Sequence, residues 1–186
     1  MTLFARMIRR ICKQVVKEEL ANLHTNMICQ VVDGTYDATL NTVSLQPVIN
    51  RIRSEDPNNP QTIQQQIIED VPVLQFGGTD LQLAKAPEDG TYGLYCVLER
   101  AVDQWFVQNG IVNPGSARKF DSDDGIFITG VFSEPGKLSA AVQTDKIELR
   151  NGDRTAFLSL DTSGAIQIDC KAGQQVNING NLTIDP

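Results

Sequence analysis

The residues with the clearest chemical potential are the carboxylates of the segment Asp121-Ser122-Asp123-Asp124-Gly125. Closely spaced carboxylates before a glycine are typical of calcium-binding loops. Such a loop places ligands at alternate positions and a bidentate Glu at the twelfth, whereas the twelfth residue counted from Asp121 is Phe132. The segment is therefore interpreted as a turn with solvated carboxylates, and no metal site is expected.

Adjacent carboxylates raise a second question, because glycoside hydrolases work with a pair of them on either side of the scissile bond. The candidate pairs are Glu88 with Asp89, and Asp123 with Asp124. Both are neighbouring turn residues without a surrounding domain large enough to hold a sugar chain. No catalytic residue is assigned, and the chain is not expected to be an enzyme. Activity on peptidoglycan would reverse this interpretation.

The four cysteines also argue against a built metal or cofactor site. Cys12, Cys29, Cys96 and Cys170 lie far apart, form no CxxC pair, and are accompanied by a single histidine, His24. A structural zinc site needs four such ligands in close spacing. The cysteines are interpreted as reduced thiols, two of them in apolar strand patterns, which favours assembly in a reducing compartment such as a cytoplasm. No cofactor is expected.

The charge distribution bears on the class of partner. Residues 1–20 contain five basic and two acidic residues, a charge of +3, so the rest of a chain whose total is −7 carries −10. Nucleic-acid affinity depends mainly on Lys and Arg that neutralise phosphates. An acidic body of this kind predicts no nucleic-acid partner, and a test of binding to single strands would decide.

The first element expected is an amphipathic helix over residues 1–22. Its apolar seam has spacings of three and four, typical of a heptad, and consists of Phe4, Ile8, Ile11 and Val15. Three interpretations stay open: packing on its own domain, docking on a partner or another copy, and binding to a membrane surface. No apolar run reaches the roughly 20 residues of a membrane span, and basic residues interrupt any signal-peptide core.

Residues 23–137 predict an OB-type barrel of about five antiparallel strands. Its centre is a strand apolar on both faces, Tyr92–Leu98, after which Trp105 and Phe106 are expected to cap one end of the core. The polar segment 51–66 is interpreted as a surface excursion. The strand-like runs are Met27–Tyr36, Thr39–Ile52, Ile67–Leu74, Leu81–Leu83, Tyr92–Leu98 and Gly125–Phe132.

Residues 138–186 change to short strands separated by Asn, Asp and Gly, each with only two or three apolar residues at period 2. A single thin ribbon of this composition buries too little to stand alone, and it exposes its edges. Three ribbons wound about one axis would pair those edges, so a homotrimeric β-prism or β-helix is predicted, with acidic residues such as Glu148 and Asp153 outside. The expected trimer core is Ile147, Leu149, Leu158, Leu160, Ile166, Ile168, Val176, Ile178, Leu182 and Ile184.

The order of these parts resembles the central spike of contractile-tailed bacteriophages. The likeness covers nearly the whole chain and lies in a helix followed by the segments DVPVLQFGG, GTYGLYCVLERAVDQWF, RKFDSDDGIFITGVF, KIELRNG and AIQID. It implies a mainly β fold with an N-terminal helix, a five-stranded OB-type barrel and a C-terminal intertwined triple-stranded β-helix in a homotrimer.

The resemblance also implies a function. Such a spike is a virion structural protein assembled in the host cytoplasm, which attaches to the tail hub at the baseplate and pierces the host outer membrane during contraction. The N-terminal seam would then form a three-fold bundle or a hub contact. Many such spikes end in an apex whose histidines bind iron in an H-x-H pattern, whereas the only histidine here is His24. A metal-free apex, a separate tip protein and an incomplete chain are the alternatives.

Overall fold

The computed structural model describes residues 3–21, 23–54, 59–78, 80–177 and 179. The chain divides into two compact units, Met1–Val131 and Phe132–Pro186. Each unit is described by itself, the first containing the N-terminal helix and a large sheet, the second a small sheet.

Helix α1 (Leu3–Ala21) begins the first unit. Its sequence contains neither Gly nor Pro and is rich in Arg, Met, Lys, Gln and Leu, which favour helix. The expected helix over residues 1–22 is therefore present across the part of that range that is described. Of the helices in the described residues, none is long and apolar enough to cross a membrane.

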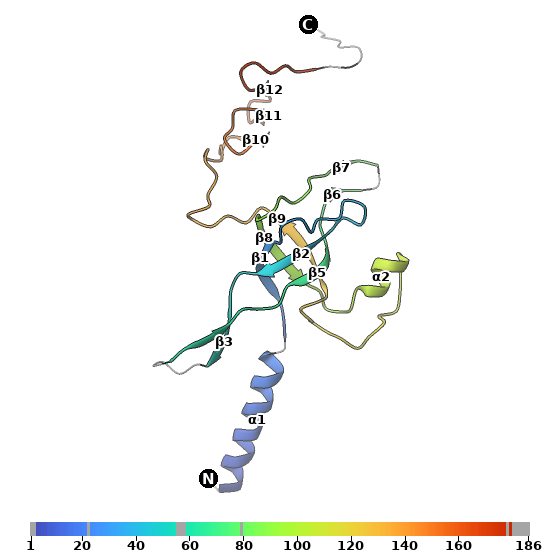
Figure 1. Cartoon of the computed structure of the whole chain (residues 1–186), viewed down its shortest axis with the longest axis vertical. Coiled ribbons are helices and arrows are strands. Elements are labelled where there is room, and N and C mark those ends of the chain that lie inside the picture. The colour runs from blue at the N-terminus through green and yellow to red at the C-terminus, as the bar shows by residue number, and fades with distance from the viewer. Residues whose placement is uncertain (1–2, 22, 55–58, 79, 178, 180–186) are drawn as a thin grey trace. The chain divides into compact units, whose positions relative to one another are not determined.

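A curled antiparallel sheet is the centre of the first unit (Figure 1). The edge strands also meet: Val73 forms a parallel bridge with Phe127, and the Leu74 N–H donates to the Phe127 carbonyl at 2.8 Å. The sheet is thus bent into a half-barrel, and the expected mainly β fold is confirmed. In spatial order the strands are β5 (Ile68–Pro72), β2 (Thr42–Pro47), β1 (Asn26–Val31), β8 (Tyr92–Val97) and β9 (Gly125–Thr129).

The core of this unit lies inside the curl. Buried residues alternate along β1, β8 and β9, as in Cys29 and Val31 of β1, because successive strand side chains point to opposite faces. Tyr95 and Phe127 are the largest fully buried side chains, and Phe127 passes over Gly93, where any Cβ would collide with it. The buried apolar residues are Cys29, Val31, Val43, Leu45, Ile68, Val71, Val73, Tyr95 and Phe127.

The predicted strands differ from the structure in extent. The run Thr39–Ile52 is divided between β2 and β3 (Arg51–Ser54), and β3 pairs with β4 (Gln61–Ile63) as a separate hairpin. Residues 51–66 therefore contain regular structure as well as loop, because two short segments pair locally without a buried face. A second two-stranded ribbon joins β6 (Phe76–Gly77) to β7 (Gln82–Leu83).

The expectation that Trp105 and Phe106 cap the core is wrong. Both lie in the short helix α2 (Asp103–Gln108), which contains no buried residue. The partly buried hydrophobic residues packed against the core are Met27, Tyr36 and Val97, and neither aromatic of α2 is among them.

The second unit contains a three-stranded antiparallel sheet, with strands β10 (Lys146–Arg150), β11 (Phe157–Asp161) and β12 (Ile166–Asp169) in that order (Figure 1). Polar side chains shape both of its turns. The Asp161 carboxylate accepts hydrogen bonds from the Ser163 and Ala165 N–H groups, and the Asn151 side chain accepts one from the Ala156 N–H. The Asn, Asp and Gly residues between the short strands thus serve as turn residues.

Candidate functional site

One face of the β10–β12 sheet is entirely apolar. Antiparallel register places Ile147 opposite Leu160, and Leu160 opposite Ile166. The neighbouring row places Leu149 opposite Leu158, and Leu158 opposite Ile168. We call these six residues the apolar sheet face: Ile147, Leu149, Leu158, Leu160, Ile166 and Ile168.

The apolar sheet face is uncovered within the described chain. Its six side chains are between 44% and 77% exposed, with Ile147 the most exposed. A sheet that is apolar on one side requires a second layer to bury it. The sequence placed all six residues in a trimer core, and the structure brings them together on one surface that is available to another chain.

The remaining predicted core residues are not part of this face. Val176 lies after β12 in an irregular segment and is exposed. Ile178, Leu182 and Ile184 lie outside the described residues. The structure therefore brings together six of the ten positions.

The opposite face of the same sheet is polar and partly closed by the chain itself. Glu148 accepts hydrogen bonds from Arg154 at 2.7 and 3.0 Å, and only 6% of its side chain is exposed. Arg150 donates to the carbonyls of Ala140 and Ala141. The Arg154 hydrogen bonds lower the pKa of Glu148. Glu148 thus lies on the face opposite the apolar sheet face, and the loop arginine rather than solvent covers it.

Helix α1 presents a second apolar surface. The predicted seam residues Phe4, Ile8, Ile11 and Val15 are all exposed, between 43% and 66%. Within the described chain the helix does not bury its seam. Docking on a partner or another copy and binding to a membrane surface stay predictions.

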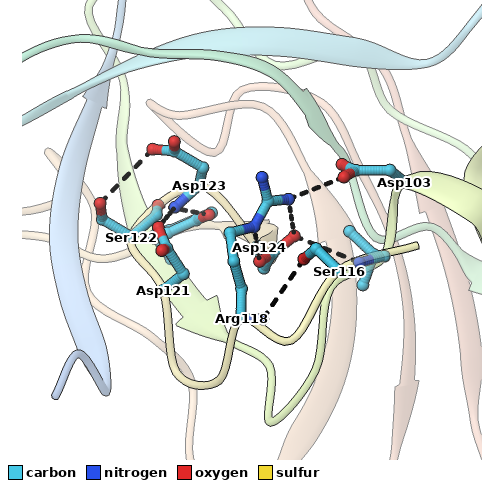
Figure 2. Close-up of polar contacts among 9 residues, drawn as sticks. Asp103, Ser116, Arg118, Asp121, Ser122, Asp123 and Asp124 are labelled. Atoms are coloured by element: carbon cyan, nitrogen blue, oxygen red, sulfur yellow. Dashed lines mark hydrogen bonds and ion pairs between the residues drawn. The ribbon is translucent and has the colours of Figure 1, made fainter. Parts of the chain in front are cut away.

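A cluster of charged residues lies in the segment that connects β8 to β9 in the first unit (Figure 2). The Arg118 guanidinium lies between two carboxylates, donating to Asp124 at 2.9 and 3.0 Å and to Asp103 at 2.7 Å. Asp124 is fully buried and also accepts a hydrogen bond from the Val102 N–H. The hydrogen bonds to Asp124 raise the pKa of Arg118, which stays protonated.

This cluster positions the start of α2 rather than a ligand. Its arginine supplies the positive charge that a cation would otherwise bring to Asp124. Asp121 accepts the Asp123 N–H, as in an ordinary Asx turn. The carboxylates are thus engaged in a turn, as the sequence predicted, but Asp124 is buried rather than solvated. Arg118 was missed in the sequence, since no local pattern shows which carboxylate an arginine will meet.

His24 lies next to an arginine. Its ring is in contact with the Arg51 guanidinium, at 2.7 Å from Nε2. Partial burial, together with the charge of Arg51, lowers the pKa of His24. The neutral ring accepts the arginine hydrogen bond and serves to connect the chain before β1 with the β3–β4 hairpin.

Comparison with known families identifies the central part of the chain. A family model described as the N-terminal domain of phage protein Gp138 matches residues 27–130. The match spans more than half of the chain and includes the whole curled sheet except the first residue of β1. No curated protein matches the chain.

Proposed function

Because the chain belongs to the family of phage proteins that share the Gp138 N-terminal domain, we propose that it is a structural protein of a contractile-tail baseplate. Three copies form the central spike of the virion, attach to the tail hub, and pierce the host outer membrane when the sheath contracts. A separate tip protein is a further candidate partner. The role is structural rather than catalytic.

The observation that carries this proposal is the apolar sheet face. Burying one Leu or Ile side chain fully stabilises by roughly 1.5–3 kcal/mol, so six uncovered ones are a strong drive to association. Only three strands pair in the described part of the second unit, and their sheet has two outer edges, β10 and β12. Three copies that turn these faces to a common axis would form the predicted triple-stranded β-prism.

The strand order of the first unit supports the OB-type barrel that the proposal requires. Its five strands form an antiparallel sheet in the order β5-β2-β1-β8-β9, and the two edge strands meet through the parallel bridge between Val73 and Phe127. A five-stranded, partly open barrel is the OB architecture. In the proposed spike this unit attaches to the hub.

The proposed mechanism of piercing is mechanical. In a prism of three chains each strand is held by hydrogen bonds and apolar contacts to its neighbours, so axial force is shared among all of them. The Glu148–Arg154 pair adds a side-chain link between β10 and the loop that follows it. We infer that such a body transmits force along its axis without unfolding.

The proposal is tested by measuring the mass of the full chain in solution. Analytical ultracentrifugation at micromolar concentration should find a trimer. Leu160→Asn, on the central strand of the apolar sheet face, should reduce the trimer fraction strongly, because each copy then buries an amide without a partner. The matched control is Val142→Asn, which changes an exposed apolar side chain of the same unit outside that face and should leave the trimer intact.

A folded monomer at micromolar concentration would remove the basis of the proposal. A trimer that survives Leu160→Asn unchanged would show that another surface holds the copies together. For the function itself, virions assembled with the Leu160→Asn chain should attach to cells but fail to permeabilise the outer membrane to a periplasmic dye.

A further inference from the structure

The residues of α1 from Phe4 to Val15 fit a heptad repeat, with apolar residues at positions a and d and basic residues only at the outer positions. With Ile8 and Val15 at position a, Phe4 and Ile11 fall at position d. β-Branched Ile at both a and d favours three or four strands over two. The residue types of the seam therefore favour an assembly of more than two helices.

The charges of α1 are compatible with contact between identical helices. In the same heptad Arg9 is at b, Arg10 at c, and Arg6 and Lys13 both at f. These positions lie on the outside of a coiled coil. The flanking e and g positions, which face neighbouring helices, are the neutral residues Ala5, Met7, Cys12 and Gln14. No like charges would meet between copies along this stretch, although the helix is strongly basic.

We propose that the occupant of the α1 seam is α1 of two further copies, in a parallel three-helix coiled coil. The inference rests on the proposed trimer. Rotation about a three-fold axis gives three identical helices the same direction, so the arrangement is parallel. Linkage through the rest of the chain raises their local concentration, which a short coiled coil of this kind requires.

Burial of the seam also accounts for the stability of α1. An isolated helix of 19 residues is marginal in water, and this one exposes seven large apolar side chains. The two other occupants are a hub protein and an anionic membrane surface. Binding to either of these would not require positions e and g to be free of basic residues. Packing between identical helices does require it, because like charges at e and g would face one another.

The test is disulfide cross-linking of the full chain in a Cys12→Ser background. Single cysteines are introduced at position a (Ile8→Cys or Val15→Cys), and each is paired with a control at the adjacent b position (Arg9→Cys or Val16→Cys). After mild oxidation, both a-position variants should form cross-linked dimers within the trimer, at least about tenfold faster than their controls. Cys29, Cys96 and Cys170 are common to all four variants and set the background.

Ile11→Asn, with Val16→Asn as its matched control, provides a second measurement. The seam variant should raise the concentration at which the trimer dissociates by about tenfold or more, because it buries an unpaired amide in each copy.

A trimer without preferential cross-linking at Ile8 and Val15 would overturn the inference and leave the proposed function standing. Absence of any trimer would overturn both. Wild type and Ile11→Asn are expected to bind equally to neutral and to anionic vesicles. Wild-type binding that requires anionic lipid and prevents the cross-link would assign the seam to a membrane.

Discussion

At the scale of single residues, the stability of the first unit is expected to depend on one buried carboxylate, that of Asp124. Asp124 accepts hydrogen bonds from Arg118 and from the Val102 N–H, and its own main chain bonds to Leu98 and Asp121. It therefore links the end of β8, the start of α2 and the turn before β9. A carboxylate is retained at this buried position because each of its oxygens has a donor.

Asp124→Ala is expected to lower the free energy of unfolding by about 2–3 kcal/mol, since it removes those acceptors from Arg118 and Val102. The loss stays below that of a fully buried pair, because the Arg118 side chain is partly exposed. Chemical denaturation followed by Trp105 fluorescence measures it. The exposed neighbour offers a control, Asp123→Ala, with an expected change within about 0.5 kcal/mol. Equal effects of both changes would contradict the role assigned to Asp124.

Glu148 is expected to make the second unit sensitive to acid. Its pKa is lowered from the ordinary value of 4.5 in the folded chain, by hydrogen bonds from Arg154. Its stabilisation is therefore fully present above pH 4.5 and is lost as the pH falls through the lower folded pKa. Thermal unfolding measured by circular dichroism at several pH values should show this loss.

Glu148→Gln should be less stable than wild type at neutral pH and lose less on acidification. Asp153 and Asp161, whose pKa values are also lowered by hydrogen bonds, account for the acid sensitivity that remains. Glu134→Gln, at an exposed position of the same unit, should follow the wild-type curve. A Glu148→Gln curve parallel to wild type at all pH values would exclude Glu148 as a source of the acid effect.

At the scale of elements, the curl of the sheet depends on close approach of β8 and β9. A Cβ at Gly93 would lie 2.4 Å from both the Ile128 carbonyl oxygen and the Phe127 ring. Both neighbours are fixed, the first by the β8–β9 ladder and the second by the core. Runs of apolar residues predicted these strands, but only the pairing of β8 with β9 shows why position 93 has no side chain.

Gly93→Ala is expected to destabilise the chain by about 1–3 kcal/mol, through overpacking against Phe127. Gly78→Ala is the matched control, because a Cβ there meets no atom within 4 Å. This control should be neutral or slightly stabilising. Thermal melting of the three proteins distinguishes them, and equal melting temperatures would mean that β8 and β9 can separate at no cost.

Strand pairing explains which element predictions were correct. The half-barrel strands were predicted because they are short runs rich in apolar residues, as in Tyr92–Val97, which is apolar on both faces. The β3–β4 hairpin was missed because it buries almost nothing and so leaves no periodic signal. Trp105 and Phe106 were predicted to cap the core because they are aromatic and follow the central strand, whereas the core consists of residues in or next to five strands distant in the sequence.

At the scale of the whole molecule, two kinds of surface coexist. The first unit closes its own core of nine buried apolar residues. The apolar sheet face and the α1 seam, by contrast, are left open. A chain built in this way is expected to fold one part alone and to stabilise its other parts by association.

The fragment 23–131 is accordingly expected to be a folded monomer. It contains the closed core and lacks both surfaces proposed for association. A cooperative unfolding transition together with a monomer mass in ultracentrifugation would support this, with the full chain as reference. A trimeric fragment would place the association on the barrel instead.

The sequence by itself determined the mainly β class, the N-terminal helix and the six residues of the apolar sheet face, because strand and helix periodicity depend only on local spacing. The tertiary structure alone decided that Asp124 meets Arg118, that Arg154 covers Glu148 and that Trp105 stays outside the core. These outcomes depend on which distant segments become neighbours. A contact between side chains leaves no trace in the spacing of either segment, and for that reason only the folded chain shows it.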